Sequence, residues 1–313
     1  MSVVPNIRFD GQAAIVTGGG RGLGRAFAMD LARRGARVIV NGRPPAAGGG
    51  GAVDSVVEEI RRAGGEAAPC YAGVETPEGG AAIVDAALQH FGRIDILINN
   101  AGFLRNGAFE ELAEPDIDAV LAVHLRAVFH LSQPAFRVMR RQGYGRIVNI
   151  TSTTALIALP GLANYAAAKG GVSALTRAMA AEGAGDRVFT NAVAPSAIGK
   201  MQAQSAIPGF KEAFAGLREK LWPRMQPETV APLVTYLASA ASQENGAAFV
   251  ACAGRFARVG LMFAKGWIAP DANAASAEDI AANYARIADM SDGFEPRTLA
   301  DIYQDIIERL PRS

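Results

Sequence analysis

Short apolar runs alternate with longer amphipathic segments from Gln12 to Ala253. Short runs bounded by turn residues are typical of buried strands, and apolar positions repeating every three or four residues are typical of helices. We expect strands at residues 12–17, 37–41, 67–71, 93–99, 146–150, 188–194 and 246–253. Strands that alternate with helices in this way predict an α/β fold of Rossmann type, a doubly wound, mostly parallel sheet in a three-layer arrangement.

The intervening segments predict helices at residues 25–34, 53–63, 76–91, 116–141, 165–182 and 228–238. The longest of them, 116–141, contains Pro134. Because proline lacks the N–H group that a helix interior requires, we expect this helix to be kinked or broken at Pro134.

The pattern changes after Gly254. Two further helices are expected at residues 276–288 and 298–310, and the capping sequence Ser276-Ala277-Glu278-Asp279 opens the first. We therefore divide the chain into a Rossmann domain at residues 1–260 and a helical C-terminal extension at residues 261–313 packed on it. Residues 201–224 follow a strand end, which is where a substrate lid would fall.

Composition narrows the range of partners. The chain has 313 residues, half of them hydrophobic, and a formal net charge of +1, so no charge excess points to nucleic acid or to an anionic membrane surface. No run of about 18 uncharged apolar residues is present, so we expect no membrane span. Cys70 and Cys252 lack the spacing of metal ligands, and no secretory signal is recognisable. We expect no metal site and a cytoplasmic location.

A glycine-rich turn follows the first predicted strand and leads into a predicted helix. It reads Thr17-Gly18-Gly19-Gly20-Arg21-Gly22-Leu23-Gly24. Glycines allow a backbone to approach a pyrophosphate, and the N–H groups of a helix N-terminus attract anions. This context favours a dinucleotide site that includes Gly18, Arg21, Gly22, Leu23 and Gly24; the alternative is a glycine-rich turn without a ligand.

The end of the second strand bears on which dinucleotide is bound. A NAD site usually has an acid here, which hydrogen-bonds the ribose 2′-hydroxyl. This chain reads Asn41-Gly42-Arg43 instead. Arg43 and Arg21 are candidates to contact a 2′-phosphate, so NADP(H) is favoured over NAD(H). The alternative is that both arginines are simply solvated.

Candidate acid–base chemistry follows the fifth strand. Ser152 comes shortly after that strand, and Tyr165 and Lys169 are one helical turn apart on the same face of the next helix. Because an ammonium group favours ionisation of a neighbouring phenol, we expect Lys169 to lower the pKa of Tyr165. Such a phenol can act as a general acid or base, while the serine hydroxyl holds a carbonyl or alcohol oxygen. Taken singly, each residue also has a purely structural interpretation.

Together these motifs resemble the short-chain dehydrogenase/reductase family. The resemblance rests on Thr-Gly-x-x-x-Gly-x-Gly at residues 17–24, Asn-Asn-Ala-Gly at residues 99–102, and the set Ser152, Tyr165 and Lys169. It implies hydride transfer between a nicotinamide and a carbonyl or alcohol carbon. Tyr165 would be the general acid/base, Lys169 would also bind the nicotinamide ribose, and Ser152 would position the substrate oxygen. Further cofactor contacts are implied for Asn100, Ala101, Gly102, Pro195 and Ile198.

A closer resemblance is to the (3R)-hydroxyacyl-CoA dehydrogenase domain of peroxisomal multifunctional enzymes. The shared stretches include Val-His-Leu-Arg at residues 123–126, Tyr-Gly-Arg-Ile-Val-Asn at residues 144–149 and the helical end of the chain. This implies an acyl-CoA as the small-molecule substrate, although a free ketone, steroid or polyketide carbonyl stays open. Specificity is expected to depend on residues 196–226 and the extension. The family resemblance also implies a homodimer or homotetramer.

His124 stands where most relatives have an asparagine whose backbone holds a water of the proton relay. A histidine can serve through its backbone in the same way, so His124 is a catalytic candidate; a packed helix histidine is the alternative. A second class of function is a non-catalytic, nucleotide-binding protein of the same fold. The complete set of Ser152, Tyr165 and Lys169 favours the enzyme.

Overall fold

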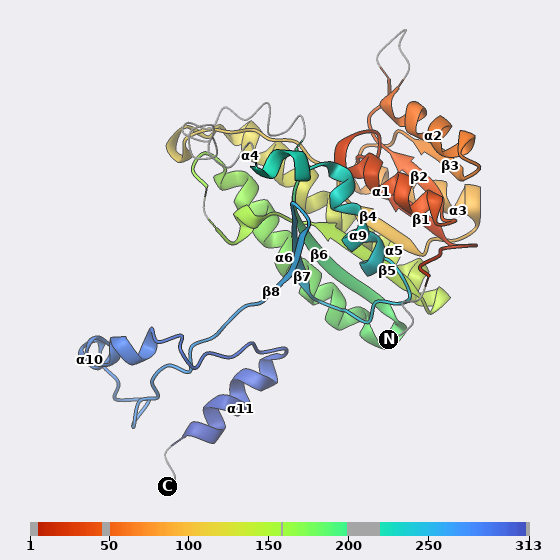
Figure 1. Ribbon diagram of the computed structural model, residues 1–313. Coiled ribbons are helices and arrows are strands. Elements are labelled where there is room, and N and C mark those ends of the chain that lie inside the picture. The colour runs from red at the N-terminus through yellow and green to blue at the C-terminus, as the bar shows by residue number, and fades with distance from the viewer. Residues whose placement is uncertain (1–5, 46–50, 158, 199–219, 311–313) are drawn as a thin grey trace. The chain divides into compact units, whose positions relative to one another are not determined.

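The larger part of the protein is built on one eight-stranded sheet (Figure 1). The computed structural model describes residues 6–45, 51–157, 159–198 and 220–310. By its contacts the chain divides into two compact units, Met1–Arg258 and Val259–Ser313. The strands of the first unit lie in the order β3-β2-β1-β4-β5-β6-β7-β8, and β1 to β7 are parallel. The predicted doubly wound α/β fold is confirmed.

The strands are β1 (Ala13–Val16), β2 (Arg37–Asn41), β3 (Glu66–Cys70), β4 (Ile96–Asn99), β5 (Gly145–Ile150), β6 (Val188–Ser196), β7 (Ala248–Cys252) and β8 (Arg255–Val259). The strand β8 was not expected. Ala253 and Gly254, both with positive φ, join it to β7. Because a two-residue connection joins antiparallel strands, β8 runs back beside β7.

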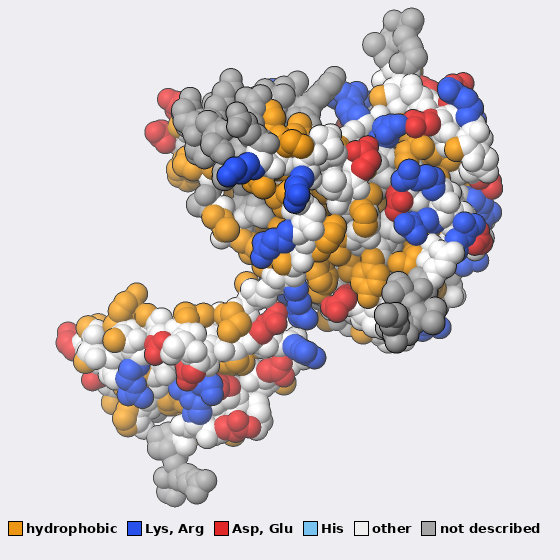
Figure 2. All heavy atoms as spheres, in the orientation of Figure 1, with side chains coloured by type: hydrophobic (Ala, Val, Ile, Leu, Met, Phe, Trp, Pro, Cys, Tyr) orange, Lys and Arg blue, Asp and Glu red, His pale blue; other side chains and the backbone are white. Residues whose placement is uncertain are grey.

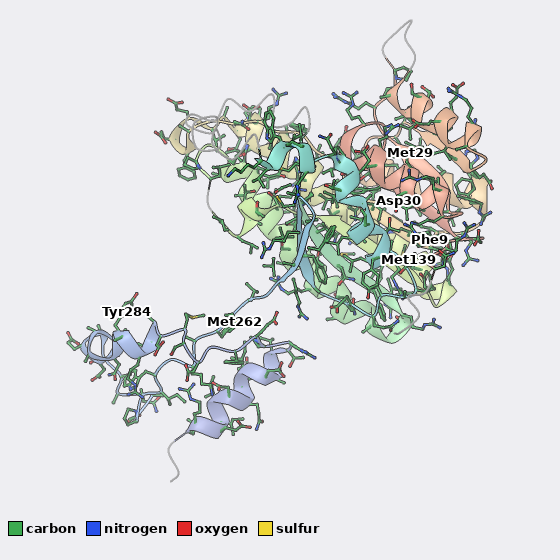
Figure 3. All side chains as sticks on the ribbon, viewed as in Figure 1. Phe9, Met29, Asp30, Met139, Met262 and Tyr284 are labelled. Carbon is green, nitrogen blue, oxygen red and sulfur yellow. The ribbon has the colours of Figure 1, made fainter. Side chains whose placement is uncertain are left out.

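Helices cover both faces of the sheet. Those of the first unit are α1 (Gly22–Arg33), α2 (Ala52–Arg62), α3 (Pro77–Phe91), α4 (Glu114–Leu121), α5 (Ala127–Gln142), α6 (Ala163–Gly183) and α9 (Ala231–Leu237). Successive residues of a strand point to opposite faces, so Ala14 and Val16 of β1 join one core and Ala13 and Ile15 join the other. The first core includes α1, α2 and α9, and the second includes α3 and α5. Figure 3 labels one member of each, Phe9 and Met139.

The order of the strands reverses at β1, which pairs with β2 on one side and with β4 on the other. In open parallel sheets, ligands bind outside the carboxyl ends of the strands at such a point. The glycine turn follows β1, and the Asn-Asn-Ala-Gly stretch begins at the last residue of β4. The fold therefore places both motifs at the position where a ligand is expected.

The helix is not broken at Pro134, and the alternative of a kink there stays a prediction. Pro134 lies inside α5, and the interruption falls earlier, at a π-helical segment called η2 (Ala122–Arg126) between α4 and α5. Pro134 leaves the carbonyl of His130 without its helical N–H partner. That carbonyl instead faces Gly80 of α3, where any added Cβ would collide with it. π-helical turns occur frequently at functional sites. The position of His124 in η2 is therefore consistent with its selection as a candidate site residue.

The second unit contains α10 (Ala277–Ile287) and α11 (Leu299–Arg309). Both begin with a capping box, at Ser276 and Thr298, which confirms the predicted start of the first. Neither helix has a buried residue, and apolar side chains such as Tyr284 and Met262, both labelled in Figure 3, are exposed. Packing of this unit on residues 1–260 stays a prediction.

Two further findings concern the described ranges as a whole. None of their helices is long and apolar enough to cross a membrane. Within the same ranges, no three His, Cys, Asp or Glu side chains gather as metal ligands would.

Acidic and basic side chains are interspersed on the face of the first unit seen in Figure 2. Of the expected lid, residues 201–219 lie outside the described residues.

Candidate active site

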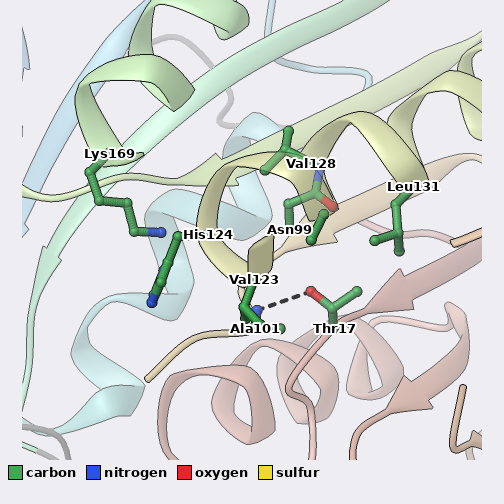
Figure 4. A pocket seen from close by; sticks show the side chains of 9 residues that line it. Thr17, Asn99, Ala101, Val123, His124, Val128, Leu131 and Lys169 are labelled. Carbon is green, nitrogen blue, oxygen red and sulfur yellow. Dashed lines mark hydrogen bonds between the residues drawn. The ribbon is translucent and has the colours of Figure 1, made fainter. Parts of the chain in front are cut away.

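Thr17 holds the glycine turn and the Asn-Asn-Ala-Gly stretch together. Its Oγ1 accepts hydrogen bonds from the backbone N–H groups of Asn100 at 2.9 Å and Ala101 at 3.0 Å; Figure 4 marks the bond to Ala101. In return, Asn100 Nδ2 donates to the carbonyl of Thr17 at 2.8 Å. Thr17 is buried, so these bonds are shielded from water. The sequence motif contained Thr17, but its role as the link between the two turns was missed.

The glycine turn has the shape and polarity of an anion cradle. A Cβ on Gly24 would collide with the carbonyl of Gly18, and a Cβ on Gly18 would lie 3.0 Å from Ala101 Cα. Arg21 is the N-cap of α1 but makes no side-chain capping bond, and no acid lies in the first turn. The N–H groups of Gly22 and its neighbours are thereby left for an anion. This backbone fits the pyrophosphate of a dinucleotide, with the partly buried Leu23 packed against the core.

The end of β2 offers no carboxylate to a ribose. Asn41 is buried, and its Nδ2 donates to the carbonyls of Cys70 at 3.1 Å and Ala72 at 2.9 Å, which ties β2 to the chain after β3. Arg43 and Arg21 are exposed. Among the described residues, neither guanidinium makes a hydrogen bond or an ion pair. Both therefore present positive charge to solvent at this end of the sheet.

Ser152 and Tyr165 meet beyond the end of β5. Ser152 Oγ accepts hydrogen bonds from the Thr154 backbone N–H at 3.2 Å and from Thr154 Oγ1 at 2.9 Å. Burial raises the pKa of Tyr165, and a hydrogen bond with Ser152 opposes that rise. The expected lowering of the Tyr165 pKa is thus wrong for this structure, because desolvation of the phenol dominates.

Lys169 is 4% exposed and lies on the same face of α6 as Tyr165. Its Nζ donates to the carbonyl of Ile150 at 2.6 Å and lies 5.8 Å from the centroid of the Tyr165 ring. Burial lowers the pKa of Lys169 to about 7. An amine that is only partly protonated near neutral pH is a weak source of positive charge for its neighbours. This is why the predicted effect on Tyr165 fails although the two side chains are close.

His124 packs against the ring of Tyr165 and lines a small cavity together with Lys169. The two rings are perpendicular, with centroids 5.0 Å apart, and His124 Nε2 is 2.6 Å from the carbonyl oxygen of Phe103. Burial lowers the pKa of His124 to about 3, with a smaller contribution from Lys169, so the imidazole is neutral at physiological pH. A Cβ on Gly102 would collide with this ring. The absence of a side chain at Gly102 therefore allows His124 to lie against the turn after β4.

A buried hydrogen-bonded chain connects β4, β5 and α6. Asn99 Nδ2 donates to Asn149 Oδ1 at 2.8 Å and to Ser132 Oγ at 3.1 Å, and Asn149 Nδ2 donates to Thr176 Oγ1 at 2.9 Å. Thr151 Oγ1 adds a bond to the Lys169 carbonyl at 3.0 Å. Asn99 lies in the Asn-Asn-Ala-Gly motif, but the pairing of these side chains was not predicted, because it depends on the register of the strands.

The remaining candidates lie at the carboxyl end of β6. Pro195 is inside β6, opposite Ala251, so the strand extends beyond its predicted end. The N–H group of Ile198 donates to the carbonyl of Met225 at 2.6 Å. The structure brings Ser152, Tyr165, Lys169 and His124 together. Among the described residues, no hydrogen bond or ring contact joins Arg43, Pro195 or Ile198 to that group.

Comparison with known proteins decides the family. The family model for the short chain dehydrogenase matches residues 12–207. The chain belongs to the short-chain dehydrogenase/reductase family. Members of this family are oxidoreductases, so the protein is an enzyme of that class.

This short-chain dehydrogenase/reductase is 38% identical over 97% of its length to the peroxisomal multifunctional enzyme type 2 of Mus musculus. The solved full-length enzyme of the same name from Drosophila melanogaster matches 97% of the chain with a TM-score of 0.79 and 31% identity. The chain spans 40% of the mouse protein and 50% of the Drosophila chain. A third relative is a structure assigned as an NAD(P)-dependent gluconate 5-dehydrogenase from Beutenbergia cavernae, with NADP bound at low occupancy. It is 35% identical, has a TM-score of 0.70, and the match covers 79% of this chain and 97% of that one.

The role of Thr17 can be tested with two substitutions of similar size. Thr17→Val removes the acceptor for the N–H groups of Asn100 and Ala101, and each buried unsatisfied group costs about 1–3 kcal/mol. We expect Thr17→Val to lower the free energy of unfolding in urea by at least about 2 kcal/mol. Thr17→Ser retains the hydroxyl and should lose less than half of that. Equal stability of the two variants would show that the hydroxyl does not hold the turns together.

Proposed function

We propose that this protein is an NADP(H)-dependent oxidoreductase that interconverts a carbonyl and a secondary alcohol, with Tyr165 as general acid/base. The observation that carries the proposal is the arrangement of Tyr165, its hydrogen bond with Ser152, and the buried Lys169 amine 5.8 Å from its ring. The catalytic unit would be residues 1–260. No observation favours the non-catalytic alternative.

The residues around the glycine turn would hold the cofactor, which supplies or accepts the hydride when bound. Those proposed to contact it are Gly18, Arg21, Gly22, Leu23, Gly24, Arg43, Asn100, Ala101, Gly102, Tyr165, Lys169, Pro195 and Ile198. The cradle at Gly18 and Gly24, which a side chain would fill, supports the pyrophosphate position. The uncapped N-terminus of α1 supports it independently.

In the direction of reduction, the hydroxyls of Ser152 and Tyr165 would donate hydrogen bonds to the carbonyl oxygen of the substrate. They would stabilise the charge that develops on this oxygen as the carbon is reduced. Tyr165 then transfers its proton to the oxygen. Because burial raises the pKa of Tyr165, the phenol is protonated at neutral pH, which fits this role. Lys169 would return a proton to Tyr165.

An acyl-CoA thioester with a 3-keto or (3R)-hydroxy group is the proposed substrate. Support comes from the resemblance to the corresponding dehydrogenase domain and from apolar side chains that follow Ser152. Leu156 and Ile157 are 50% and 72% exposed. Exposed apolar groups near a polar centre are suited to a substrate with an apolar chain. A homodimer or homotetramer is proposed on family grounds alone.

Substitution of the proposed acid tests the central assignment. With NADPH and a 3-ketoacyl-CoA, Tyr165→Phe should lower kcat at least about 100-fold, because the proton donor is lost. The measurement is the decrease in nicotinamide absorbance, with NADPH binding followed separately by fluorescence. Tyr284→Phe, on the exposed face of α10, is the matched control and should retain wild-type turnover. Near-normal turnover by Tyr165→Phe would refute the assignment.

The cofactor preference can be tested at Arg43. If its guanidinium contacts a 2′-phosphate, Arg43→Ala should raise the KM for NADPH at least about tenfold, as expected for loss of a charge-assisted contact, and leave that for NADH nearly unchanged. Arg141→Ala, at the exposed end of α5, serves as a control for loss of positive charge. Equal changes for NADPH and NADH would count against a 2′-phosphate contact.

A further inference from the structure

Asn164 comes directly before Tyr165 in the first turn of α6 and is 5% exposed. Its amide oxygen, Oδ1, accepts a hydrogen bond from the backbone N–H group of Tyr165 at 2.7 Å. The first N–H groups of a helix have no carbonyl partner within the helix, and the N-cap of α6, Leu162, makes no side-chain hydrogen bond. Asn164 therefore satisfies a backbone group of the proposed general acid itself.

The amide nitrogen of the same side chain binds to other parts of the chain. Asn164 Nδ2 donates to the carbonyl of Arg105 at 3.1 Å, within the segment 100–107 that follows β4, and to the carbonyl of Asp116 in α4 at 3.5 Å. Turning the amide over would place its oxygen against these carbonyls and its NH2 group against the N–H group of Tyr165. The side chain therefore has one orientation in which its hydrogen bonds are made.

Two other contacts hold the segment 100–107 in place. The N–H group of Gly107 donates to the carbonyl of Gly161, just before α6, at 3.2 Å. The side chains of Arg105 and Asp116 form an ion pair at 3.6 Å, but both are well exposed, and exposed ion pairs contribute little stability. The hydrogen bonds of the buried Asn164 amide are shielded from water and should contribute more.

The segment 100–107 is thus held at both ends. Thr17 binds the N–H groups of its first two residues beside the glycine turn, and Asn164 binds a carbonyl near its other end, beside Tyr165. The cofactor is proposed to bind at the glycine turn, so the segment extends from the cofactor side of the site to the general acid. Misplacement of reacting groups by about 1 Å can cost about a hundredfold in rate, so the position of this segment matters for catalysis.

We propose that Asn164 is a positioning residue of the Tyr165 centre, whose amide holds the segment 100–107 against the first turn of α6 and so fixes the phenol relative to the cofactor side of the site. The kinetic part of this proposal rests on the proposed function, whereas the part that concerns the segment does not. A residue that only completed the first turn of α6 would need an oxygen for the N–H group of Tyr165 and no amide nitrogen.

Asn164→Asp separates these two roles, because aspartate keeps the shape and the oxygen that accepts from Tyr165 but has no N–H group to donate. An acidic side chain in the first turn also suits the helix dipole, so α6 should still form. We expect kcat to fall at least about tenfold, with less than about a twofold change in the KM for NADPH. Asn164→Ala loses both sets of hydrogen bonds, and aspartate should give no rescue relative to alanine.

The solvent deuterium isotope effect on kcat distinguishes misplacement from loss of folded enzyme. A misplaced Tyr165 slows proton transfer, so the isotope effect should rise, whereas a smaller active fraction would lower the apparent kcat and leave the isotope effect unchanged. Asn245→Asp is the matched control, because Asn245 accepts from the Thr190 N–H group and donates to the Ala180 carbonyl, each at 2.9 Å. It should keep the wild-type kcat and isotope effect. Wild-type values in Asn164→Asp would overturn the positioning role.

A readout independent of turnover follows the segment 100–107 itself. Its Gly107 amide bonds to Gly161 and its Phe103 amide to His124, so both should exchange slowly with deuterium in the cofactor-free protein. We expect both to exchange at least about tenfold faster in Asn164→Asp, because local opening no longer has to break the hydrogen bonds of Asn164. Unchanged exchange would overturn the claim that Asn164 holds the segment. If no carbonyl is reduced by the wild-type protein, the proposed function fails, and the exchange rates still decide this claim.

Discussion

Burial of the Lys169 amine without an acidic partner is the constraint on which the site depends. No carboxylate among the described residues pairs with it, and its Nζ donates to the carbonyl of Ile150 at the end of β5. Desolvation disfavours the charged form of any group here, which accounts for the lowered pKa values of Lys169 and His124 and the raised pKa of Tyr165. The centre is accordingly close to neutral. Hydrogen bonds to a developing oxyanion are strong in such a medium, because little water competes for it.

The structure around Lys169 is held by specific hydrogen bonds at the carboxyl edge of the sheet. Thr17 joins the turn after β1 to the turn after β4, while the chain from Asn99 through Asn149 to Thr176 joins β4 and β5 to α6. The side chains of Thr17, Asn99, Asn149 and Thr176 are buried, so loss of one of these hydrogen bonds leaves an unsatisfied polar group. The site is thereby formed by elements distant in sequence whose relative position is fixed by the parallel register.

The sequence predicts the frame well because its strands are buried on both faces and stand out as continuous apolar runs; β2 has the predicted bounds. Prediction from the sequence fails where the neighbouring residues alone do not determine the conformation of the backbone. Pro134 lies within α5, and the carbonyl of His130, which lacks its helical partner, packs on Gly80, a contact between distant segments. The π-helical turn at His124 has no sequence signature, and the Ala253-Gly254 turn before β8 is not one of the usual hairpin pairs.

The site residues are predicted through spacing, whereas their ionisation is not. The interval between Tyr165 and Lys169 places both on one face of α6, as found, but the sign of the pKa shift depends on burial, which the interval does not report. Thr17 and Asn99 lie within recognisable motifs, yet their partners become evident only with the strand order. The cofactor preference, the substrate and the packing of residues 261–313 stay predictions.

The most direct measurement is the pH dependence of unfolding in the cofactor-free protein, compared with Lys169→Met and with Lys265→Met, which removes an exposed lysine. The pKa of Lys169 is about 7 in the folded protein and near its ordinary value of 10.5 when unfolded. Between these pH values the unfolded chain binds the additional proton, so stability rises with pH. We predict that wild type and Lys265→Met gain up to about 4 kcal/mol relative to Lys169→Met as pH rises from 7 to 10. Parallel stability curves for all three proteins would contradict the claim that burial controls the charge of this lysine.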